Sequence, residues 1–360
     1  MTEKLQRVRQ LLREQQLDAV LITRRDNIAW LTEGKTFYVV DRAEAGVASL
    51  LVSTHDVLLI APDNEMPRIL AEEPLPFAIT PRSYPWYQSL DNVLPTLALS
   101  RIGSDICRAN SQDVQTDFVH LRTRMTPAEC DRFLQLGRQT AAVIEKVARS
   151  VRPGLTEREV EARIYAACLP LGIRPVCTLI AVDTRISAFK HPIPGTTQMR
   201  KKMLLTLGAE REGLNVSMTR MVHAGPPSDA SRQLLRSVAE IHADILMASR
   251  PARPWQDIFS DIQASYARHG FPEGWKAHHQ GGPAGYGCRD FIVTPETPGA
   301  LALNQAMAWN PTLSGVKSED TSLLTEDGPQ WLTRTGDWPM MNIHRGDKTW
   351  QFADWLMIEP

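Results

Sequence analysis

The chain lacks net charge and is poor in cysteine. Its 360 residues carry 40 Lys and Arg against 41 Asp and Glu, a formal net charge of -1. No net positive field exists to displace counterions, which argues against nucleic acid as the main partner. The cysteines are odd in number, scattered and without a CxxC pair, namely Cys107, Cys130, Cys168, Cys177 and Cys288. This pattern favours reduced thiols, as in a cytoplasm, over a disulfide framework or a zinc site.

Long hydrophobic runs are also missing. No apolar run reaches the roughly 18 residues that a membrane span needs, and the best candidate, residues 46–62, is interrupted by Ser53, His55 and Asp56. The opening residues MTEKLQRVRQLL are charged throughout and have no apolar signal-peptide core. We therefore expect a cytoplasmic protein without a membrane segment.

The remaining composition is that of a globular protein. Hydrophobic residues make up 43% of the chain and charged residues 22%, and the length suggests two domains. Residues 1–122 predict a small mixed α/β domain. An amphipathic helix at the start precedes apolar, strand-like runs at 17–23, 47–53 and 56–62. Residues 74–95 contain five prolines and are expected to be largely loop.

Residues 123–360 predict a larger α+β domain. Thr126 with Glu129, and Thr156 with Glu159, have the spacing of capping boxes that begin two helices. Strand-like segments follow at 176–182, 201–210 and 214–222, then helices at 229–249 and 255–269, and strands and turns from 289 onward. Helices followed by strands thus occur twice, which suggests an internal pseudo-two-fold.

Six local patterns in this order carry a family resemblance. They are TPAE, GLTERE, FKHPIPG, a strand pair ending in TR, HHQGG and EDTSLLTEDG. The larger domain resembles the pita-bread fold of the methionine aminopeptidase, prolidase, aminopeptidase P and creatinase superfamily. The N-terminal third resembles the smaller domain of prolidases and creatinases. The resemblance covers nearly the whole chain.

The resemblance implies a two-metal centre held by two Asp, one His and two Glu, but the matching positions have mostly lost these side chains. They are occupied by Thr206, Ser217, Gly282, Asn310 and Glu319. Two divalent cations carry four positive charges and need anionic oxygen ligands. With one ligand of five retained, we expect no metal and no other cofactor.

What remains resembles creatinase, the branch that hydrolyses a carbon–nitrogen bond without metal. By this resemblance His191 is the general acid/base, because imidazole both takes and returns protons near neutral pH. Glu319 is then an acidic group that grips the substrate. The alternatives are a structural loop histidine and an exposed acid.

The same resemblance places His278 among catalytic residues that contact the substrate. Adjacent histidines point in different directions, so at most one of His278 and His279 is expected in the pocket. Lys317 and Glu319 share a face if their segment is a strand, and form either a salt bridge or a site for a zwitterion. Asp320 and Arg220 are expected to be structural.

Further substrate contacts are expected from several polar residues. Arg289 suits a carboxylate through its planar fork, with a surface ion pair to Asp290 as the alternative. Ser217 is expected to donate or accept a hydrogen bond, since no nucleophile-elbow pattern surrounds it. Asn310 and Tyr286 are assigned to the same substrate pocket.

The N-terminal domain contributes a possible cap. In creatinase-like homodimers this domain closes over the partner's pocket, which by resemblance assigns Phe37, Tyr38 or Arg42 to the neighbouring site. An ordinary aromatic core cluster is the alternative.

Three functions stay open. The first is a metal-independent hydrolase of a C–N bond in a small amino-acid or guanidino-type substrate, with lyase chemistry as a variant. The second is an Xaa-Pro-type metallopeptidase with unusual ligands, for instance His191, His278, His279 and Glu319. The third is a non-catalytic protein that binds a small molecule.

Overall fold

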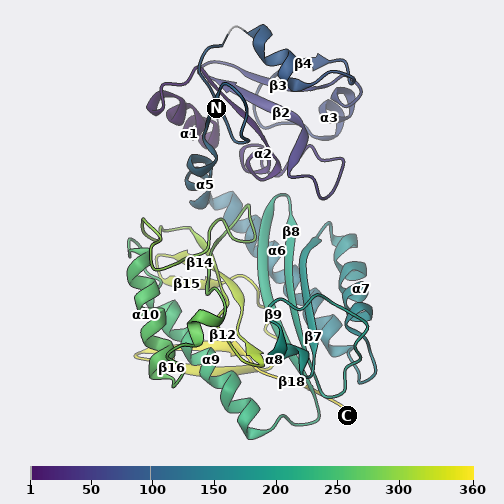
Figure 1. Cartoon of the computed structure of the whole chain (residues 1–360), viewed down its shortest axis with the longest axis vertical. Coiled ribbons are helices and arrows are strands. Elements are labelled where there is room, and N and C mark those ends of the chain that lie inside the picture. Colours follow the sequence, from purple (N-terminus) through teal and green to yellow (C-terminus); the bar gives the residue numbers. More distant parts are fainter. Residues whose placement is uncertain (1, 98) are drawn as a thin grey trace. The chain divides into compact units, whose positions relative to one another are not determined.

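The computed structural model describes residues 2–97 and 99–360, which form two compact units (Figure 1). The first unit runs to Thr123 and the second spans Arg124–Pro360. The boundary expected after residue 122 lies one residue from this division. Within the described ranges, no helix is both long and apolar enough to cross a membrane.

The first unit is built on a six-stranded mixed sheet of order β4-β3-β2-β1-β5-β6. Its strands are β1 (Ala19–Arg24), β2 (Ala45–Ser53), β3 (Val57–Pro62), β4 (Thr80–Tyr84), β5 (Ile102–Ser104) and β6 (Ser111–Asp113). The expected apolar runs are found in β1, β2 and β3. The expectation that residues 74–95 are largely loop is wrong in part, because β4 adds to the edge of β3 and a short helix follows.

The helices of this unit are α1 (Glu3–Glu14), α2 (Arg25–Leu31), α3 (Met66–Glu72), α4 (Leu90–Val93), η1 (Leu94–Leu97) and α5 (Gln115–Thr123). The apolar spacing of the first helix has the predicted effect: Leu5, Val8, Leu11 and Leu12 are buried. The α/β character expected for this unit is thereby confirmed.

The helices of the second unit begin where the sequence indicates. Both capping boxes are formed, Thr126 with Glu129 and Thr156 with Glu159. They begin α6 (Pro127–Arg149) and α7 (Glu157–Cys168). The other helices described in this unit are η2 (Leu169–Leu171), α8 (Arg185–Ala188), α9 (Asp229–Ala248), α10 (Trp255–Arg268) and η3 (Gly274–Ala277).

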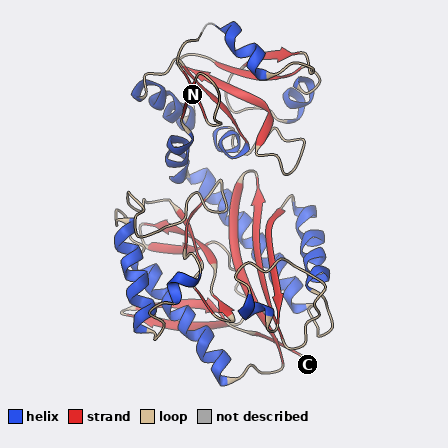
Figure 2. Cartoon of the chain, in the orientation of Figure 1, coloured by secondary structure: helices blue, strands red, loops and turns tan. Residues whose placement is uncertain are grey.

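Two four-stranded sheets lie in this unit (Figure 2), with orders β18-β9-β8-β7 and β10-β11-β14-β15. The first contains β7 (Arg174–Val182), β8 (Lys202–Arg211), β9 (Leu214–Ala224) and β18 (Leu356–Ile358); the second contains β10 (Gly281–Ala284), β11 (Ala306–Trp309), β14 (Asp320–Thr325) and β15 (Gly328–Trp331). Two ribbons complete it, β12 (Thr312–Leu313) with β13 (Val316–Lys317), and β16 (Met340–Arg345) with β17 (Lys348–Ala353).

The two sheets are joined where β9 meets the start of β14. The Ser217 amide donates to Thr321 Oγ1 at 2.8 Å, and the Thr219 amide donates to the Glu319 carbonyl at 2.9 Å. Strand β9 therefore holds residues 319–321 by its backbone. This junction fixes the position of the polar side chains described below.

A buried ion-pair cluster lies beneath the junction. The Arg220 side chain is fully buried and contacts Glu145 of α6 at 3.1 Å and Asp320 of β14 at 3.0 Å. Arg334 contacts the other oxygen of Asp320 at 2.8 Å. The expectation that Arg220 and Asp320 have structural roles is consistent with these contacts, which tie α6, β9 and β14 together.

Replacement of Arg220 tests this role. We expect Arg220→Met to lower the free energy of unfolding by about 3–5 kcal/mol, because it removes the buried cation that contacts Glu145 and Asp320. The matched control is Arg236→Met, an exposed residue of α9 whose partner is the half-buried Glu240 one turn further along the helix, with an expected change of about 0.5 kcal/mol or less. Urea denaturation measures both, and equal effects of the two substitutions would contradict the assignment.

Candidate active site

A buried carboxylate with two cations forms the centre of the site. The Glu319 side chain is 4% exposed. Its Oε2 lies 2.8 Å from Lys317 Nζ and its Oε1 lies 3.0 Å from Arg289 Nη2. Thr219 Oγ1 donates a third hydrogen bond to Oε2 at 2.7 Å. The carboxylate is therefore paired on both oxygens.

The two cations control the ionisation of Glu319. Burial by itself would raise the pKa of this carboxyl, but the positive charges of Lys317 and Arg289 outweigh it and hold the pKa at about 2. Glu319 is thus a carboxylate at any physiological pH. One carboxylate and two cations leave this cluster with an excess of one positive charge.

A polar face of the β8–β9 pair surrounds the carboxylate. In the antiparallel register Thr206 lies opposite Thr219, and their hydroxyls are 2.7 Å apart. Ser217 lies two residues from Thr219, on the same face, and its Oγ accepts from Arg289 Nη1 at 3.1 Å. Thr219 was not among the predicted site residues, although its alternation with Ser217 along β9 is the signal that would have identified it.

Three histidines lie together beside this cluster. His191 comes from the loop between α8 and β8, and its Nε2 is 3.0 Å from the Nε2 of His278. His278 Nδ1 lies 2.5 Å from the carbonyl oxygen of His279. A carbonyl only accepts, so His278 carries its proton on Nδ1 and directs the Nε2 lone pair at His191.

All three imidazoles are held in the neutral form. Burial lowers the pKa of His278 to about 3 and that of His279 to about 4, and the positive charges of Lys317 and Arg289 add to the effect on His279. Burial and Lys317 also lower the pKa of His191. Each ring therefore keeps one nitrogen lone pair at neutral pH, and that of His278 is directed at His191.

The expectation that adjacent histidines diverge is wrong. The rings of His278 and His279 are 4.1 Å apart between centroids, and His279 is 5.9 Å from His191. Strict alternation applies to regular strands, whereas these residues lie between η3 and β10. Gly281, with φ of 101°, turns the backbone directly afterwards.

Asn310 and Tyr286 have different surroundings. Trp309 pairs with Asp320, so the register carried one residue further sets Asn310 opposite Glu319. The Asn310 side chain is buried, and its Oδ1 has no hydrogen-bond partner among the described residues. Tyr286 is buried as well, but its hydroxyl donates to Glu129 Oε1 at 2.6 Å. That contact with α6 corrects its assignment to the pocket.

The N-terminal cap residues are also separated by the structure. Phe37 is fully buried in its own unit, which corrects the expectation that it reaches a partner's pocket and favours the aromatic-core alternative. Arg42 is exposed, and its role at a partner's site in a homodimer stays a prediction. Arg25 lies over the Tyr38 ring, 4.9 Å from its centroid.

The residues present do not fit a two-metal carboxylate centre. At Gly282 an added Cβ would lie 2.4 Å from the Phe291 carbonyl oxygen, so this position has no room for a ligand side chain. Thr206, Ser217 and Asn310 are neutral, and Glu319 is already paired with Lys317 and Arg289. These residues therefore lack both the negative charge and the donor atoms that two divalent ions require.

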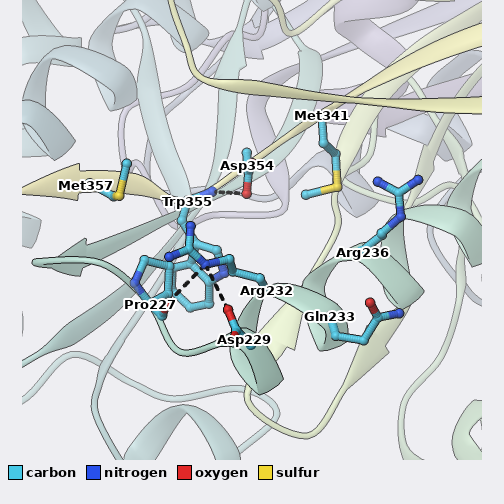
Figure 3. Close-up of a pocket in the computed structure, with 9 residues that line it drawn as sticks. All are labelled: Pro227, Asp229, Arg232, Gln233, Arg236, Met341, Asp354, Trp355 and Met357. Carbon is cyan, nitrogen blue, oxygen red and sulfur yellow. Dashed lines mark hydrogen bonds and ion pairs between the residues drawn. The ribbon is translucent and has the colours of Figure 1, made fainter.

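A small, mostly apolar recess opens beside Lys317. Phe189, Pro192, Ile186 and Val316 supply its walls, and Thr206 also lines it. A separate cavity of about 340 Å³ lies between α9 and β18 (Figure 3), where Arg232 and Arg236 face Met341 and Trp355. None of the residues around Glu319 or the three histidines lines this separate cavity. We place the candidate site at Glu319 and the histidines.

Comparison with known proteins matches both units. Residues 131–326 match the model of metallopeptidase family M24, and residues 4–111 match the creatinase/prolidase N-terminal domain. The Xaa-Pro dipeptidase of Pyrococcus furiosus is 22% identical over 356 residues, covering 93% of this chain and 99% of the relative. An uncharacterized peptidase of Staphylococcus saprophyticus is 24% identical over 354 residues, covering 92% and 99%.

Solved structures show the same fold. The prolidase from Pyrococcus horikoshii superimposes with a TM-score of 0.79 at 18% identity, covering 93% of this chain and 99% of that one. The X-Pro aminopeptidase from Thermotoga maritima gives 0.75 at 19%, covering 92% and 97%. The N-terminal domain of FACT complex subunit SPT16 from Cicer arietinum gives 0.72 at 9%, covering 93% and 95%. The predicted pita-bread architecture is confirmed.

The ionisation of Glu319 is testable through acid stability. Its folded pKa of about 2 lies below the ordinary value of 4.5, so the unfolded chain binds more protons between these values. The stabilisation is complete above about pH 4.5 and is lost as the pH falls toward 2. We expect Glu319→Gln to flatten the dependence of the unfolding free energy on pH in this window. An unchanged slope in urea denaturation at pH 3–5 would contradict the assignment.

Proposed function

The chain belongs to metallopeptidase family M24, and we propose that it hydrolyses a C–N bond in a small amino-acid, dipeptide or guanidino-type substrate without a two-metal centre. The observation that carries the proposal is the double ion pair of Glu319. Lys317 and Arg289 occupy both of its oxygens, so this carboxylate is paired with side-chain cations and is not available as a bridging metal ligand.

Charge and unsatisfied polar atoms support substrate binding at this place. The Lys317 ammonium has three protons, of which the Glu319 contact uses one. Lys317 also lines the apolar recess, whose volume of about 20 Å³ holds little more than one water-sized group, so we place a single carboxylate oxygen of the substrate there. The unpartnered Oδ1 of Asn310 is a buried acceptor suited to a substrate N–H, since buried polar atoms normally have a partner.

His191 supplies the proton transfer. It is exposed, unlike His278, and its neutral ring is a base at pH 7. The His278 Nε2 lone pair accepts the His191 Nε2–H, which leaves the His191 Nδ1 lone pair to take a proton from water. Water attacks the carbon, and the same proton then passes to the leaving nitrogen. His278 thus positions His191 and fixes its tautomer.

A second candidate function rests on the cluster of histidines. The names of the relatives suggest an Xaa-Pro dipeptidase, and the ring nitrogens of His191, His278 and His279 lie within 4.8 Å of one another. A peptidase that uses these nitrogens in place of the usual carboxylates would need a transition metal for activity. The two candidates therefore differ in their response to metal removal.

Replacement of His191 tests both. We expect His191→Ala to lower kcat by about 10²–10⁴-fold on the best substrate of a panel of Xaa-Pro dipeptides, other dipeptides and guanidino acids. Burial and Lys317 lower the pKa of His191 below the ordinary imidazole value of about 6.5, so wild-type activity should persist at pH 6.5 and fall only at a lower pH, as His191 becomes protonated. The control is His344→Ala, on β16, whose side chain bonds Thr349 at 2.9 Å.

The same assays are run on protein freed of metal and kept in chelator. Activity under these conditions supports the metal-independent reaction. Activity that appears only after Zn, Mn or Co is added supports the second candidate and overturns the first. Substrate binding in a thermal-shift assay without turnover under either condition overturns both and indicates a non-catalytic binding protein.

A further inference from the structure

We propose that His191, His278 and His279 form a binding site for a single transition-metal ion, distinct from the carboxylate positions of the family. One nitrogen from each ring lies within 4.8 Å of the others. Ligand nitrogens on one tetrahedral zinc ion are about 3.3 Å apart, because each bond is about 2.0–2.1 Å long. The His191–His278 separation of 3.0 Å is already close to this value, so the nitrogen of His279 has to move by up to about 1.5 Å to complete the site.

Hydrogen bonding prepares His278 as a ligand. Its Nδ1–H is donated to the His279 carbonyl, which fixes the ring orientation and leaves the Nε2 lone pair toward His191. Histidines that bind metals normally donate their second nitrogen in this way. For His191 Nε2 to bind as well, its proton moves to Nδ1. This tautomer shift leaves the ring neutral.

His279 supplies a second, independent observation. Its Nδ1 is buried and has no hydrogen-bond partner within the described ranges of the chain. The His279 ring packs against His278, with centroids 4.1 Å apart, and lies 5.9 Å from His191 on the far side of His278, which is itself 4.8 Å from His191. A buried nitrogen without a partner calls for a ligand or a proton donor from outside the chain.

The donor set selects the metal. Three neutral imidazoles suit Zn²⁺, Co²⁺, Ni²⁺ or Cu²⁺, whereas Ca²⁺ and Mg²⁺ require oxygen ligands. Lys317 acts electrostatically on all three rings and Arg289 on His279, which opposes any cation and favours metals with strong nitrogen affinity. Because His191 is exposed, one coordination position remains for water or substrate.

Direct binding measurements test the site on the full chain. After metal removal, Zn²⁺ is titrated in competition with a chromophoric chelator, and Co²⁺ is followed by visible absorption. We expect one ion per chain, a Co²⁺ spectrum of tetrahedral type, and at least a 10-fold loss of affinity in His278→Ala and His279→Ala. His279→Gln provides a variant that keeps the polar side chain, and circular dichroism establishes that each variant is folded.

Two control variants distinguish this site from other histidines. His269→Ala removes a ring that contacts Glu240 and Asp244, and His344→Ala removes an exposed one; both should bind Zn²⁺ as the wild type does. The proposal is overturned if no ion binds, or if affinity is unchanged in folded His278 and His279 variants. It is also overturned if His269→Ala abolishes binding.

Binding and hydrolysis give separate readouts. The metal and the shared proton compete for the same nitrogens of His191 and His278. Under the metal-independent reaction, Zn²⁺ bound here should therefore inhibit with the same concentration dependence as binding. Under the second candidate it should activate. Binding without any measurable activity would leave the metal site established and overturn the proposed hydrolysis alone.

Discussion

The second unit depends on one constraint: a carboxylate, Glu319, is buried at the junction of two sheets and has to remain ionised. An isolated carboxylate buried in this way would be neutralised by protonation, because desolvation penalises its charge. Lys317 and Arg289 prevent this from both sides. Since the Glu319 backbone is also held by Thr219, the ion pairs and the strand register fix the same residue. The polar face, the recess and the histidines are arranged around it.

These ion pairs also explain why the residues of this site do not fit a two-metal carboxylate centre. Four carboxylates close together are stable only with cations between them. Here neutral Thr206, Ser217 and Asn310 reduce the negative charge, and two side-chain cations balance what remains. Gly282 adds a steric barrier, because the backbone of Phe291 occupies the space of a side chain. A two-metal carboxylate centre would therefore require several coordinated substitutions and a shift of the 291–293 backbone.

Much of the fold follows from local patterns in the sequence. Thr126 and Thr156 determine where two helices begin, and strand-like runs such as 17–23 and 176–182 are found close to their expected bounds, because capping and apolar spacing are local effects. The strand within segment 74–95 could not be predicted from its own composition, since β4 is stabilised by pairing with β3. The sequence left two alternatives for Lys317, and the ion pair with Glu319 is one of them. Arg289 pairs with Glu319 and not with the neighbouring Asp290 that the sequence offered as an alternative, because that contact joins residues distant in sequence.

The same distinction limits what could be foreseen of the histidines. Their chemistry was readable from residue type, but their convergence depends on the backbone between η3 and β10, where neither helical nor strand periodicity applies. Tyr286 shows the converse: its sequence neighbourhood suggested the pocket, yet its hydroxyl is bound to Glu129 of α6. A fold shared with prolidases and with a FACT complex subunit does not choose between functions. The function depends on three neutral imidazoles beside an excess positive charge. The proton of the proposed hydrolysis and the proposed metal ion compete for the same nitrogen lone pairs of these rings.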